Sequence, residues 1–114
     1  MGRNDPNDRP QPMQPAAVPS ALETWQVRTR GRVQGVGFRE ACVRRARRAG
    51  VTGWVRNRLD DSVELMLQGS PERLADLCAW LRQGDHPALV ASVEITQVAP
   101  PFPRFDAFER LPTV

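Results

Sequence analysis

The sequence predicts an α+β domain of the split β-α-β type, in which two helices cover one face of a mostly antiparallel sheet of four to five strands. Three observations support this fold class. Segments that alternate between apolar and polar residues, as strands do, are separated by two stretches of helical periodicity. Their order is β-α-β-β-α-β, followed by a further short strand. The length of 114 residues suits one small domain with a single core.

The first half of the domain contains three expected strands and a helix. Residues 25–30 alternate in polarity, which predicts the first strand. Apolar residues at helical spacing predict a helix over residues 38–49, and Gly50 is a natural end for it. A second strand is expected over residues 51–58. After a turn, the alternation over residues 63–68 predicts the third strand, with its apolar side chains on one face.

The second half is expected to contain a helix and two further strands. Ser70 is a suitable N-cap for a helix that runs to Gly84. Residues 90–98 alternate again, with Val93 and Ile95 as the expected buried pair. Residues 105–111 predict a short final strand at an edge. Its two phenylalanines have opposite parity, so either a bulge intervenes or only one of them faces the core.

The chain divides into two parts. Residues 1–22 are rich in proline and polar or small residues, without periodicity, and are expected to form a disordered leader. Residues 23–114 are expected to form the folded domain. The leader has no continuous apolar segment and no apolar run approaches membrane-spanning length, so neither a secretory signal nor a membrane span is expected. We expect a small cytoplasmic monomer.

The cysteines and the histidine do not suggest a metal or redox site. Cys42 and Cys78 lie within helical patterns and are expected to be reduced thiols that face the core, although a disulfide between two packed helices is geometrically possible. The single histidine, His86, lies beside a proline in a polar loop and has no ligand cluster at suitable spacing, so a surface position is expected. No metal and no cofactor are expected.

Charge is distributed unevenly along the chain. Residues 28–58 contain ten arginines and one acid, whereas residues 59–114 contain four arginines and nine acids. Such a basic region could attract nucleic acid or a phosphorylated ligand, and part of it is the solvated face of a helix. A nucleic-acid-binding module is the alternative function, but the expected strands lack both an array of exposed stacking aromatics and an RNP-type signature. We therefore expect no nucleic-acid partner.

The glycine-containing stretch from Gly31 to Arg39, GRVQGVGFR, is the best candidate for a binding site. Glycine permits positive φ, and successive N–H groups just before a helix favour anions. Arg39 offers a planar fork of donors for phosphate or carboxylate oxygens. The spacing fits neither the phosphate loop of nucleotide-binding enzymes nor the dinucleotide fingerprint. The stretch is either an oxyanion-binding loop or a plain strand-to-helix turn with an exposed arginine.

Asn57, at the end of the second expected strand, has two interpretations. Asparagine before a turn usually serves the turn itself. Its amide could instead accept a hydrogen from a water molecule and donate to a phosphoryl oxygen. The end of the second strand in this fold can lie near the loop after the first strand, which makes Asn57 a candidate for positioning a nucleophilic water.

The run GRVQGVGFR, followed by GVTGWVRN at residues 50–57, resembles the acylphosphatase family, and the resemblance covers roughly residues 24–112. It implies a ferredoxin-like fold and hydrolysis of the carboxyl–phosphate bond of small acyl phosphates, without metal or cofactor. It also implies that Arg39 clamps the phosphoryl group and that Asn57 holds the attacking water. The phosphoryl oxygens would be bound by the backbone N–H groups of Gln34, Gly35, Val36, Gly37, Phe38 and Arg39.

The sequence departs from the family pattern at two places. Asp60-Asp61 replaces the usual Asp-Gly of the turn after Asn57, and Arg110 stands where an aliphatic residue is common. Aspartate tolerates left-handed backbone at some cost, so the turn can be altered while the site is retained. A related possibility is an acylphosphatase-like domain that serves a larger carbamoyl-phosphate enzyme. The end of the chain at Val114 favours a free-standing hydrolase.

Overall fold

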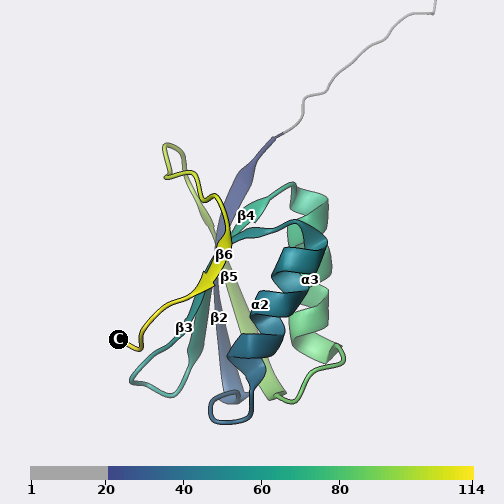
Figure 1. Cartoon of the computed structure of the whole chain (residues 1–114), viewed down its shortest axis with the longest axis vertical. Helices are drawn as coiled ribbons and strands as arrows, with labels where there is room; N and C mark the ends of the chain where they lie inside the picture. The colour runs from purple at the N-terminus through teal and green to yellow at the C-terminus, as the bar shows by residue number, and fades with distance from the viewer. Residues whose placement is uncertain (1–20) are drawn as a thin grey trace, which may run out of the picture.

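A computed structural model describes residues 21–114 and contains one five-stranded sheet with two helices on one of its faces (Figure 1). The strand order across the sheet is β5-β2-β4-β3-β6. Neighbours are antiparallel except for the parallel pair β3 and β6. The elements are β2 (Glu23–Arg32), α2 (Phe38–Ala49), β3 (Thr52–Asn57), β4 (Val63–Gly69), α3 (Pro71–Gln83), β5 (Leu89–Val98) and β6 (Phe108–Arg110).

This arrangement confirms the predicted fold class and most of the predicted elements. The expected leader, residues 1–22, lies outside the described residues except for its last two positions. Neither of the helices within residues 21–114 is long and apolar enough to cross a membrane.

The helix ends follow from local chemistry. Gly37 and Gly50 adopt left-handed backbone at the two ends of α2, with φ of 83° and 72°. At the start of α3, the Ser70 hydroxyl accepts a hydrogen bond of 3.3 Å from the Arg73 N–H, and Pro71 occupies the first turn. These caps confirm the boundaries predicted from Ser70 and Gly50.

The core lies between the helices and the inner face of the sheet. Inner-face residues of β2 and β4, such as Val27, Leu65 and Leu67, are fully buried against the helices. Both cysteines are buried free thiols, as expected. Burial raises the pKa of the Cys78 thiol to about 11 and also raises that of Cys42. The two thiols are therefore poorly reactive while the chain is folded.

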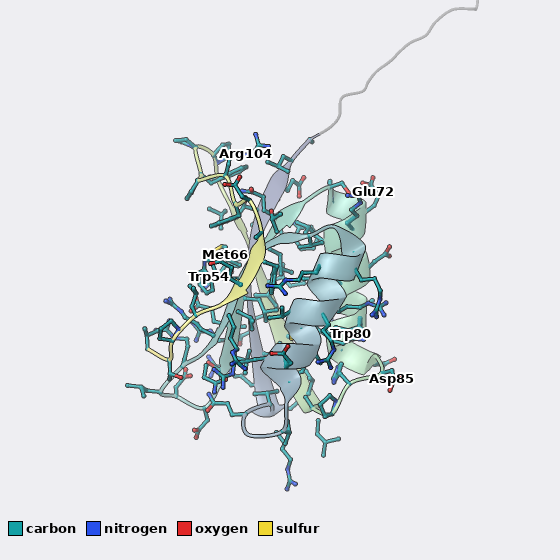
Figure 2. All side chains as sticks on the ribbon, viewed as in Figure 1. Trp54, Met66, Glu72, Trp80, Asp85 and Arg104 are labelled. Atoms are coloured by element: carbon teal, nitrogen blue, oxygen red, sulfur yellow. The ribbon has the colours of Figure 1, made fainter. Side chains whose placement is uncertain are left out.

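The opposite face of the sheet carries Trp54 and Met66, whereas Trp80 lies on the helical side (Figure 2). The guanidinium of Arg56 lies over the Trp54 ring at 4.5 Å from its centroid. Two polar residues that β4 places on this outer face, Glu64 and Gln68, are nevertheless buried, with exposed fractions of 4% and 2%. The simple alternation of β4 did not predict that burial.

The two edge strands differ from the sequence prediction. Ile95 was expected to be buried with Val93, but it is 38% exposed, because β5 is an outer strand with a neighbour on one side only. At the other edge, β6 begins at Phe108, which is buried, while Phe105 precedes the strand and is half-buried. Only one of the two phenylalanines therefore belongs to the inner face of the last strand.

Candidate active site

The loop between β2 and α2 is held at both ends by buried side chains. Val33 and Phe38 are each 1% exposed and belong to the core. Between them the chain turns through Gly35 and Gly37, whose φ values of 75° and 83° lie in the left-handed region that glycine adopts without strain. A Cβ at Gly35 would meet open space, so this side of the loop is accessible to a ligand. Residues 34–39 are called the cradle below.

The cradle presents backbone N–H groups at the start of α2. Gly37 is the N-cap of the helix and, having no side chain, supplies no capping bond to the first turn. Within residues 21–114, the N–H groups of residues 34–37 donate no hydrogen bond. The N-terminus of a helix also carries partial positive charge. This geometry favours an anion at the cradle.

Several cradle residues surround a hollow of about 80 Å³. Arg39, in the first turn of α2, lines it, and in the described part of the chain the Arg39 side chain forms no ion pair. The other lining residues are Val33, Gly35, Gly37, Phe38, Glu40 and Arg110. Gln34, Val36 and Asn57 do not line this hollow. The predicted cradle therefore contributes four of its six residues to one small concave site.

Gln34 instead connects the cradle to the end of β3. Its side-chain amide donates one hydrogen bond of 2.9 Å to the carbonyl oxygen of Arg58 and another of 2.8 Å to that of Ser62. Both acceptors belong to the β3–β4 turn, which begins immediately after Asn57. The glycine loop therefore lies near the end of the second strand, as predicted. The contact is made by the side chain of Gln34, for which the sequence predicted only a backbone N–H contact.

Asn57 is the last residue of β3 and pairs with Val63 of β4. It has the same parity as the fully buried Val55 and so lies on the helical face of the sheet. Its side-chain oxygen Oδ1 is buried and accepts no hydrogen bond from any residue between 21 and 114. Buried acceptors without a protein partner are uncommon in folded proteins.

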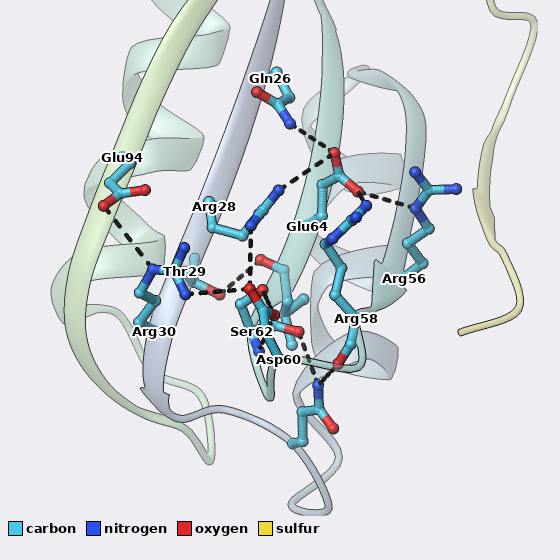
Figure 3. Close-up of polar contacts among 12 residues, drawn as sticks. Gln26, Arg28, Thr29, Arg30, Arg56, Arg58, Asp60, Ser62, Glu64 and Glu94 are labelled. Atoms are coloured by element: carbon cyan, nitrogen blue, oxygen red, sulfur yellow. Dashed lines mark hydrogen bonds and ion pairs between the residues drawn. The ribbon is translucent and has the colours of Figure 1, made fainter. Parts of the chain in front are cut away.

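The β3–β4 turn accommodates its two aspartates. Asp61 adopts φ of 70°, the left-handed conformation that glycine would otherwise supply. The Asp60 carboxylate accepts hydrogen bonds from the hydroxyl and the N–H of Ser62, and these lower the pKa of Asp60 to about 2. The same carboxylate lies 3.4 Å from both Arg28 and Arg30 (Figure 3).

Next to this turn, a buried carboxylate on β4 holds two arginines in place (Figure 3). Glu64 accepts hydrogen bonds from Gln26 at 2.6 Å, Arg58 at 2.8 Å and Arg56 at 2.9 Å. Burial raises the pKa of Glu64, but the three donors outweigh it and the net effect is a lowered pKa. Arg56 and Arg58 flank Asn57 in the sequence, so Glu64 anchors the side chains on both sides of this residue. Sequence reasoning did not identify this network.

His86 is half-buried, which corrects its expected surface position. Its ring lies 4.9 Å from that of Phe38 and 4.8 Å from that of Trp80. Nδ1 accepts a hydrogen bond from the Ala88 N–H at 3.2 Å, so the proton is on Nε2, which donates to the Leu81 carbonyl at 3.0 Å. Both ring nitrogens are therefore occupied, and His86 supports the ring of Phe38 beneath the cradle.

Comparisons with known proteins agree with the sequence motif. The Acylphosphatase family model matches residues 25–109. Acylphosphatase 1 of Ralstonia nicotianae is 63% identical over 87% of this chain and 97% of its own length, and acylphosphatase of Polaromonas naphthalenivorans is 58% identical over 82% and 92%. The crystal structure of acylphosphatase from Bacillus subtilis superposes with a TM-score of 0.73 at 27% identity, covering 80% of this chain and 99% of that one.

Proposed function

Because the chain belongs to the acylphosphatase family and hydrolyses acyl phosphates, we propose that the cradle binds the phosphoryl group of the substrate and that Asn57 holds the attacking water. The observation that carries this assignment is the glycine-shaped loop at the uncapped start of α2, with Arg39 beside it. Backbone N–H groups would bind the equatorial phosphoryl oxygens, and the Arg39 guanidinium would bind two of them through its planar fork.

The proposed reaction requires few groups because the substrate is reactive. A water molecule bound to Asn57 Oδ1 attacks phosphorus, the bond from phosphorus to the acyl oxygen breaks, and the carboxylate leaves with the bonding electrons. The proton of the water passes to a phosphoryl oxygen of the substrate. Since a carboxylate is a good leaving group, no general acid is needed. Catalysis is then positioning together with stabilisation of charge on the phosphoryl oxygens.

The buried Oδ1 of Asn57 supports the water-binding role. An acceptor without a protein partner in the described residues is suited to a water hydrogen. The two bonds from Gln34 to the adjacent turn would keep that acceptor at a fixed position relative to the cradle.

The direct test is hydrolysis of benzoyl phosphate by the full chain in excess EDTA. We expect activity to persist after exhaustive chelation, because among residues 21–114 no three histidine, cysteine or carboxylate side chains are grouped as metal ligands. A requirement for added magnesium or zinc would contradict the mechanism.

The proposed contact of Arg39 with the phosphoryl group can be tested by substitution. Arg39→Ala should raise KM and lower kcat together, and Arg39→Lys should restore little, because an ammonium group lacks the two-pronged contact. Arg48→Ala, on the exposed side of the same helix, is the matched control and should hardly change either constant. If Arg39→Ala and Arg48→Ala changed KM and kcat equally, Arg39 would not bind the substrate as proposed.

We further propose a cytoplasmic monomer without a nucleic-acid partner. The two free, buried thiols suit a reducing compartment.

Much of the arginine-rich segment is paired within the fold, since Arg28, Arg30, Arg56 and Arg58 form ion pairs with Asp60 and Glu64. That neutralisation weakens the case for binding of a polyanion. Light scattering and a salt-dependent RNA-binding titration would test the two parts of this proposal.

A further inference from the structure

Arg110 places a second guanidinium beside the hollow at the cradle. It is the last residue of β6, pairs with Val55 of the parallel strand β3, and shares the parity of the buried Phe108. Its side chain therefore leaves the sheet on the helical side, at the start of α2. There it lines the same hollow as Arg39 and the glycines of the cradle.

Arg110 forms an exposed ion pair with Glu40, and breaking this pair costs little free energy. Its Nη1 lies 3.6 Å from Oε1 of Glu40, and both side chains are about half exposed. Oε2 of Glu40 also lies 3.9 Å from Arg44, so this one carboxylate has two cationic neighbours. An exposed pair of this geometry contributes little stability. If Arg110 turned to another anion, Glu40 would retain Arg44 as a partner.

Two guanidinium groups thus line one small site, and a single phosphoryl group bound by the cradle and Arg39 accounts for only one of them. We propose that Arg110 selects acyl phosphates whose acyl part carries a second negative charge, such as a distal carboxylate or phosphate. This inference rests on the proposed binding of the phosphoryl group at the cradle. With that group on the N–H donors and Arg39, the second guanidinium that lines the hollow, that of Arg110, is left to contact the acyl part.

The test compares two substrates of equal chain length, pentanoyl phosphate and glutaryl phosphate, which differ by a terminal carboxylate. The measured quantity is the ratio of kcat/KM for glutaryl phosphate to kcat/KM for pentanoyl phosphate, after subtraction of spontaneous breakdown. Arg110→Leu should lower this ratio about threefold to tenfold, the size expected for one partly exposed charged contact. Raising the salt concentration should reduce the ratio of the unmodified protein in the same direction.

Arg44→Leu is the matched control. It removes the same charge from the neighbourhood of Glu40, but Arg44 does not line the hollow at the cradle, so the ratio should be unchanged. An equal loss of kcat/KM for both substrates in Arg110→Leu would mean that Arg110 binds the phosphoryl group, and would overturn the proposal. An unchanged ratio in Arg110→Leu, or an equal fall in Arg44→Leu, would also overturn it. Failure of the unmodified chain to hydrolyse either substrate would contradict the proposed function itself.

Discussion

At the scale of single residues, Asn57 gives the sharpest test of the mechanism. Asn57→Ala removes the buried Oδ1 that is proposed to hold the water, so kcat should fall by about 10²–10³, the usual effect of losing one positioning group. Inorganic phosphate should still inhibit competitively, because the cradle and Arg39 are intact. If the Asn57→Ala protein folded and kept a near-normal kcat, Asn57 would serve only the turn and would not position the water.

Gln34 should act as a positioning residue. Gln34→Leu removes both hydrogen bonds to the β3–β4 turn, although the Arg58 and Ser62 carbonyls each keep one backbone donor. We therefore expect a modest loss of stability, about 1–2 kcal/mol, together with a fall of about tenfold in kcat and a smaller change in phosphate inhibition. Thermal melts and steady-state kinetics measure both effects. Gln97→Leu, exposed on β5, is the control. A loss of stability without a change in kcat would argue against positioning.

The sequence pointed to some residues of the candidate site and missed others for a physical reason. Arg39 and the cradle glycines were predicted because their chemistry depends on local spacing along the loop. The amide of Gln34 bonds to residues 24 and 28 positions away, and such partners are not visible in spacing. Arg110 was noted only as an unusual residue in its strand. Its position beside the cradle depends on the parallel pairing of β6 with β3, which alternation alone does not determine.

At the scale of elements, the network around Glu64 makes the end of β3 sensitive to acid. The folded-state pKa of Glu64 is lowered, so its contribution to stability is complete above its ordinary pKa and is lost as pH falls through the lowered value. Glu64→Gln should destabilise the protein by about 1–3 kcal/mol at pH 7, because Arg56 and Arg58 lose their partner. This difference should shrink toward pH 3 in thermal melts. Glu94→Gln, an exposed partner of Arg30 at 3.9 Å, should have little effect at any pH.

Most element boundaries were predicted correctly because caps and periodicity are local. Ser70, Gly50 and the alternation of β2 and β4 all give the observed structure. Burial at the edge strands was not predicted correctly, as Ile95 illustrates, because alternation identifies the face of a residue but not how far the helices cover it. The burial of Glu64 was missed for a similar reason. Alternation places Glu64 on the outer face of the sheet, but it does not reveal that Arg56 of β3 and Arg58 of the β3–β4 turn pair with it there.

At the scale of the whole molecule, charge pairing limits which arginines are available to bind an anion. The arginines of the outer sheet face are paired with Asp60 and Glu64, and Arg47 donates two hydrogen bonds to the Phe108 carbonyl. Several other arginines in the described part of the chain, such as Arg32 and Arg48, also have no carboxylate partner. Of these unpaired arginines, Arg39 is the one that lines the hollow at the cradle. The cradle is therefore expected to be the main anion site of a protein whose formal net charge is only +3.

Phosphate should accordingly stabilise the folded chain more than chloride does at the same ionic strength. A ligand that binds only the folded state raises the free energy of unfolding by RT ln(1 + [L]/Kd), about 1.4 kcal/mol at a tenfold excess over Kd, which corresponds to a rise of several degrees in Tm for a domain of this size. Arg39→Ala should abolish most of the difference between the two anions, and Arg48→Ala should preserve it. Asn57→Ala should also preserve it, because water positioning is not needed for phosphate to bind. Equal Tm shifts with phosphate and chloride in the unmodified protein would mean that the glycine loop is a structural turn and that the phosphoryl group binds elsewhere.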